Sequence, residues 1–179
     1  MAEPSTLAPE IYKRFEQAET KGTKASLKEG GEYWRRTLAP EKGTKGSSAY
    51  GPVQITGDLF KDVKDRRVQF GVAKSDEKFL DYFISQAKEF LKYGNEPKKK
   101  GYSKIYDYTE KGGGQGFFGD PTKQRLIEEL GGKEAIKAAY ERIAERIMMK
   151  NYKDSGTEEG AIRTWRGVKD SKYSDRYFN

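Results

Sequence analysis

The hydrophobic positions in the second half of the chain repeat at helical spacing. Apolar residues recur at intervals of three and four in the stretches 79–91 and 133–150. This spacing gathers them on one face of an α-helix and so predicts a long amphipathic helix in each stretch. Ser75 or Asp76 can cap the start of the first helix, and Gly94 can end it.

Three shorter helices are predicted from capping residues combined with apolar spacing. They are expected over 8–20, from Asp120-Pro121 to Gly131-Gly132, and from Thr157 to Trp165. Acidic residues in the first turn of the last helix favour that assignment, because they complement the positive end of the helix dipole.

Only one stretch shows the alternation of a strand. Val68, Phe70 and Val72 are separated by polar residues, which predicts a short strand. The expected architecture is therefore one mainly α domain over 8–179, with a small β or irregular patch near 45–72. A loose N-terminal arm is expected over 1–7.

The composition indicates which kinds of partner the protein can bind and excludes several kinds of site and catalysis. The 179 residues suit a single domain, and a net charge of +7 favours nucleic acid, anionic lipid or an acidic cell-wall polymer as partner. The chain has no Cys and no His, which excludes disulfides, zinc–thiolate sites and His-based catalysis. An enzyme of this composition must use carboxylates, Tyr, Lys or Arg, and we expect neither a metal nor a cofactor.

The chain also has no obvious targeting or membrane segment. No apolar run approaches the roughly 20 residues of a membrane-spanning helix. The opening MAEPSTLAPE has acids and prolines where a secretory signal has a basic and then an apolar stretch. We therefore expect no membrane span and no signal peptide.

The run Gly46–Thr56 is the most specific stretch of the sequence. Its Ser, Gly and Pro residues favour a turn leading into a buried segment, in which Val53 and Ile55 fill the core. Gln54 lies between these two apolar residues, and a buried amide must find hydrogen-bond partners. A glutamine held by the fold can bind an uncharged polar ligand such as a sugar. From the residues alone both interpretations stay open.

The residues 49–55 resemble the glycine–x–x–glutamine–isoleucine signature of soluble lytic transglycosylases and goose-type lysozymes. Gly51 and Gln54 fall on its Gly and Gln positions. In this lysozyme-like superfamily the signature follows a catalytic Glu that closes the first core helix. Glu19-Thr20, at the end of the predicted 8–20 helix, fits that description. The resemblance is closest to the lysozyme-like domains of tailed bacteriophages.

The resemblance implies an α+β lysozyme-like fold and cleavage of the β-1,4 bond between N-acetylmuramic acid and N-acetylglucosamine in peptidoglycan. One Glu would act as general acid and base, since the N-acetyl oxygen of the substrate replaces a second carboxylate. The cleaved glycan strand would end either in a hydrolysed sugar or in a 1,6-anhydro sugar. The protein would be made in the host cytoplasm and reach the wall by holin-type release or virion delivery.

The resemblance and the neighbouring residues together define a candidate site. Glu19 is the expected catalytic acid, with Glu29 and Glu32 as alternatives because Gly and aromatic neighbours can place either in a cleft. Glycan strands are expected to contact aromatic and polar side chains in loops and near the motif. These are Trp34, Ser48, Tyr50, Gly51, Gln54 and Trp165.

Two other functions compatible with the sequence involve no catalysis. A basic binding module, associated with nucleic acid or with a virion structure, would use the +7 charge while the motif merely packs. An inactive lysozyme-like domain would bind glycan without cutting it. The oligomeric state does not follow from the sequence.

Overall fold

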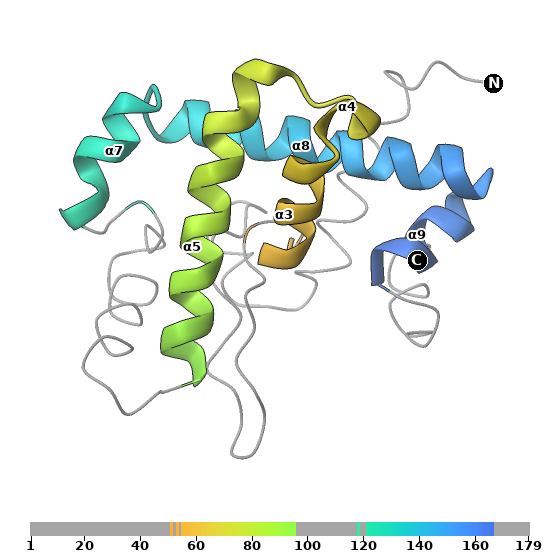
Figure 1. Ribbon diagram of the computed structural model, residues 1–179, viewed down its shortest axis with the longest axis horizontal. Helices are drawn as coiled ribbons and strands as arrows, with labels where there is room; N and C mark the ends of the chain where they lie inside the picture. The colour runs from red at the N-terminus through yellow and green to blue at the C-terminus, as the bar shows by residue number, and fades with distance from the viewer. Residues whose placement is uncertain (1–50, 52, 54, 96–117, 119–120, 167–179) are drawn as a thin grey trace.

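The computed structural model describes residues 51, 53, 55–95, 118 and 121–166, and helices dominate this part of the chain (Figure 1). In chain order its elements are α3 (Gly57–Asp65), α4 (Arg67–Phe70), the 3₁₀ turn η1 (Lys74–Asp76), α5 (Glu77–Asn95), the 3₁₀ turn η2 (Pro121–Lys123), α7 (Gln124–Glu129), α8 (Lys133–Ser155) and α9 (Glu158–Arg166). The described residues contain no strand. The part of the chain that the structure describes is therefore mainly α.

The strand predicted over 68–72 is wrong, and so is the β or irregular patch where it overlaps α3 and α4. Val68 lies in α4 and is 80% exposed, whereas Phe70 and Val72 are buried. The N–H of Gly71, at a φ of 69°, bonds back to the α4 carbonyls, and the Arg67 guanidinium donates to the Val72 carbonyl at 2.7 Å. A helical turn closed in this way buries its flanking apolar residues and mimics the alternation of a strand.

The two long helices predicted from apolar spacing are confirmed. α5 begins at Glu77, directly after η1, and α8 continues to Ser155, beyond the predicted end at 150. Asp76, in η1, is nearly buried and its two carboxylate oxygens accept hydrogen bonds from Arg142 at 2.8 and 3.2 Å. This ion pair joins the start of α5 to the middle of α8.

The core lies where α3, α5 and α8 meet. α3 and α5 lie side by side, and α8 runs across them (Figure 1). Phe60 stacks on Phe83 with ring centroids 5.1 Å apart, and Tyr140 makes T-shaped contacts with both rings at centroid distances of 6.0 and 5.6 Å. All three rings are fully buried. One aromatic residue from each helix thus fixes the packing of the three.

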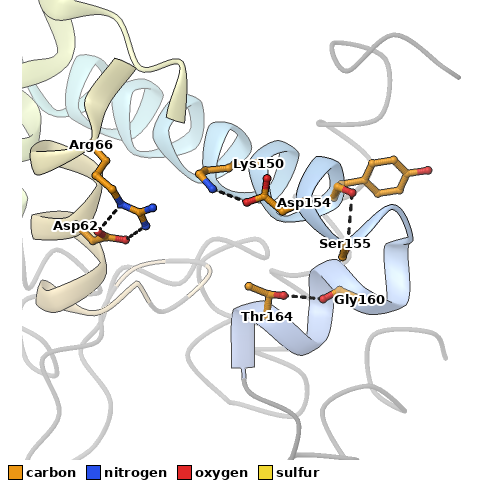
Figure 2. Close-up of polar contacts among 8 residues, drawn as sticks. Asp62, Arg66, Lys150, Asp154, Ser155, Gly160 and Thr164 are labelled. Carbon is orange, nitrogen blue, oxygen red and sulfur yellow. Dashed lines mark hydrogen bonds and ion pairs between the residues drawn. The ribbon is translucent and has the colours of Figure 1, made fainter. Parts of the chain in front are cut away.

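The Phe70 ring of α4 contacts a cation of α8. Phe70 is buried, with the Arg66 guanidinium 5.2 Å and the Lys150 ammonium 5.3 Å from its centroid. Arg66 also pairs with Asp62, and Lys150 pairs with Asp154 (Figure 2). The cations therefore bind both a ring and a carboxylate, so the α3–α4 corner is attached to α8 without leaving an unpaired charge at these two positions.

The ends of the shorter helices follow the predicted capping residues. After α7, the N–H groups of Gly131 and Gly132 donate to the carbonyls of the last turn at 3.0 and 2.9 Å, and both glycines have positive φ. The hydroxyl of Thr157 accepts from the N–H of Gly160 at 3.0 Å and so caps α9. The predicted closure at Gly131-Gly132 and the predicted start at Thr157 are confirmed.

Candidate functional site

Most of the predicted site residues lie outside the part of the chain that the structure describes. They are Glu19, Glu29, Glu32, Trp34, Ser48, Tyr50 and Gln54, and the predicted 8–20 helix lies there too. Two predicted site residues are described. Gly51 lies against α8, and Trp165 belongs to the last turn of α9. The structure thus describes Gly51 and Trp165 but none of the three candidate acids.

Gly51 is buried against the side chain of Tyr140. Its φ is 82°, in the left-handed region that disfavours every residue with a Cβ. A Cβ at this position would lie 2.5 Å from Cζ and 2.6 Å from Oη of Tyr140. Glycine is therefore required here both by the backbone conformation and by the close approach of the ring.

The next described residues of the motif continue into the core. Val53 and Ile55 are 0% and 1% exposed, which confirms the prediction that they fill the core. The N–H of Ile55 donates to the Tyr140 hydroxyl at 3.4 Å. Thr56 then ends the segment, because its hydroxyl accepts from the Leu59 N–H and caps α3.

The described motif residues are thus attached to one side chain of α8, from a position 85 residues away in sequence. Tyr140 is fully buried, so these contacts are made out of water. The predicted contribution of Gln54 to ligand binding stays a prediction, as does that of Gly51. What the geometry provides is a firmly held backbone on either side of Gln54.

A tight corner between α8 and α9 holds the helix that carries Trp165. Gly156 ends α8 at a φ of 76°, and the hydroxyl of Ser155 donates to the Thr157 carbonyl at 2.9 Å. A Cβ at Gly160 would lie 2.6 Å from the Cβ of Ser155, so α9 approaches the end of α8 closely. Figure 2 shows this corner beside the Lys150–Asp154 pair.

Among the acids that the structure describes, Glu145 of α8 has a carboxyl group in an unusual setting. Burial raises its pKa above the ordinary value, the charge of Glu141 adds to the rise, and Arg146 opposes it. Sequence reasoning missed Glu145. The signal in the sequence was weak: the residue borders the apolar face of the helix, three positions before the buried Met148.

The described residues contain no group of three or more acids that could hold a metal ion. The acidic pairs Glu128-Glu129 and Glu158-Glu159 lie within α7 and α9, where adjacent side chains diverge. None of the described helices is long and apolar enough to cross a membrane.

Comparison with known proteins adds no relative. Searches of protein-family models, characterised proteins and solved structures found no match to this chain. Any function of this chain must therefore be inferred from its own residues and from the geometry around Tyr140.

Proposed function

We propose that the protein is a glycosidase that cleaves peptidoglycan, with Glu19 as its general acid and base. The observation that carries the proposal is the order of Glu19-Thr20 and, downstream, the run Tyr50–Ile55. The structure supports it at one point: Gly51, on the glycine position of the signature, cannot be replaced without a steric clash. A residue so constrained suits a backbone that must keep one conformation to bind a ligand.

The proposed chemistry needs a single carboxyl group. Glu19, protonated, donates its proton to the glycosidic oxygen while the N-acetyl oxygen of the same sugar attacks the anomeric carbon and the C–O bond breaks. The resulting oxazolinium ring is opened by water or by the 6-hydroxyl of the sugar. The carboxylate of Glu19 takes the proton released in that second step. Water gives hydrolysis, and the 6-hydroxyl gives a 1,6-anhydro end.

The other proposed site residues bind the glycan. The Gln54 amide can donate to one sugar oxygen and accept from a hydroxyl or an acetamido N–H. Trp34, Tyr50 and Trp165 provide rings against which sugar rings can stack. The +7 net charge attracts the protein to the anionic wall without taking part in bond cleavage.

The deciding experiment measures loss of turbidity of purified cell walls by the wild type and by Glu19→Gln. The amide keeps the size of the side chain but cannot donate a proton, so activity should fall by about 10²–10⁴-fold. Glu29→Gln and Glu32→Gln, which change the two alternative acids, are the matched controls. Glu145→Gln is the control for an acid with a raised pKa. All three should keep most of the activity, and circular dichroism should show a normal fold for each variant.

Other results of these experiments would indicate a different acid, product or function. A dead Glu29→Gln beside an active Glu19→Gln would move the acid to position 29 and keep the glycosidase. Mass spectrometry of the products separates the two endings, because a 1,6-anhydro end is lighter than a hydrolysed end by one water. A wild type that binds walls without cutting them is an inactive glycan-binding domain. A wild type that ignores walls and retards DNA on a gel is a nucleic-acid-binding module.

A further inference from the structure

We propose that Tyr140 is a positioning residue: it holds Gly51 and Ile55, the described residues that flank Gln54 in the sequence, and thereby positions Gln54 for glycan binding. The part of this inference that concerns glycan rests on the proposed function. The part that concerns the backbone stands on the structure alone, so the two can fail separately.

Two independent contacts join Tyr140 to this segment. Its ring occupies the space in which a Cβ of residue 51 would stand, at 2.5 Å, and its hydroxyl accepts the N–H of Ile55 at 3.4 Å. The contacts flank Gln54, one on each side along the chain. A single side chain therefore constrains the backbone both before and after the residue proposed to bind the sugar.

Tyr140 is itself rigidly placed. It is 0% exposed, and Phe60 and Phe83 meet its ring from α3 and α5. A ring enclosed in this way keeps one orientation, since protein interiors leave little room for rotamer changes. The packing of three helices therefore fixes the position of the hydroxyl, and the hydroxyl in turn holds the N–H of Ile55.

Loss of the hydroxyl should loosen the segment without breaking the core. Tyr140→Phe keeps the ring and its packing but leaves the buried N–H of Ile55 without this acceptor. A buried donor without a partner is destabilising, so local opening at Ile55 should become about tenfold more frequent. The core helices should open as before.

Amide hydrogen exchange of the full chain, followed by NMR, tests this directly. In Tyr140→Phe the Ile55 amide should exchange about tenfold faster, with little change in α5. The control is Tyr82→Phe, which removes the hydroxyl of another buried tyrosine, on α5. Unchanged exchange at Ile55 would overturn the inference, and so would equal acceleration throughout α3, α5 and α8, because that would indicate a general structural role.

A kinetic cycle tests the link to Gln54. On a soluble glycan, Tyr140→Phe should raise KM more than it lowers kcat, and Tyr82→Phe should change neither. Combined with Gln54→Ala, Tyr140→Phe should have much less effect than it has alone, since both changes act through one group. Fully additive effects would overturn the positioning of Gln54. If the wild type cuts no glycan, the proposed function fails, and the exchange experiment still decides the role of Tyr140.

Discussion

At the scale of single residues, Gly51 is subject to a backbone constraint and a steric one. Its φ of 82° is unfavourable for any residue with a Cβ, and the Tyr140 ring fills the adjacent space. Gly51→Ala should therefore lower the free energy of unfolding by about 2–4 kcal/mol, combining left-handed strain with overpacking. Chemical denaturation measures this loss.

Gly156→Ala is the matched control, because Gly156 has a similar φ of 76° and a methyl group there would have no neighbouring atom within 4 Å. Gly156→Ala should lower the free energy of unfolding only by the backbone strain, about 1 kcal/mol. If the two variants lose the same stability, the close approach of the Tyr140 ring contributes nothing and the steric argument fails.

Ionisation of Glu145 should destabilise the folded protein. Because burial raises its pKa above the ordinary 4.5, the folded protein binds a proton here more tightly than the unfolded chain does. Stability should therefore fall as the pH rises from about 4.5 through the folded pKa, and the loss should persist at neutral pH.

Glu145→Gln removes this ionisation, so the variant should melt at a higher temperature than the wild type at pH 7. The difference should disappear below about pH 4, where Glu145 is protonated in both states. Thermal melts across this pH range test the sign. Glu134→Gln, at the exposed first turn of α8, is the control and should give no gain at pH 7. An equal gain from Glu134→Gln would mean that the burial of Glu145 is not the cause of the gain.

At the scale of elements, the α8–α9 corner depends on the cap of α9. The Thr157 hydroxyl accepts the Gly160 N–H at 3.0 Å, and the Thr164 hydroxyl donates to the Gly160 carbonyl at 2.9 Å. Thr157→Ala should lower the free energy of unfolding by about 0.5–2 kcal/mol, because it leaves an N–H in the first turn of the helix without its acceptor.

Thr164→Ala is the internal comparison. It removes an exposed hydroxyl from the same helix, but the carbonyl that the hydroxyl contacts lies within the helix, so the change should be close to neutral. Urea denaturation of both variants gives the comparison. A larger loss in Thr164→Ala than in Thr157→Ala would contradict the capping argument.

At the scale of the whole molecule, the net charge of +7 bears on binding to the wall. Under the proposed function, added salt should reduce activity on intact walls, because it screens the attraction between exposed charges. Activity on a short uncharged glycan should stay nearly constant over the same range. Rates on the two substrates across a salt series test this, and an equal response on both would remove electrostatic attraction as the cause.

The sequence by itself determined those elements that depend on neighbours within a turn or two. The apolar spacing of α5 and α8, the glycine closure after α7 and the Thr157 cap of α9 are all local, since a helix satisfies its hydrogen bonds and buries one stripe within short range. The absence of His and Cys likewise limits the chemistry whatever fold the chain adopts.

Only the tertiary structure decided features that depend on residues distant in sequence. The alternation at 68–72 predicts a strand wrongly, because three alternating residues cannot reveal that Val68 faces water while Phe70 and Val72 are buried. The approach of Gly51 to Tyr140 spans most of the described chain, and the partial burial of Glu145 depends on what packs around α8. Burial and close approach are properties of the assembled core, so no local pattern specifies them.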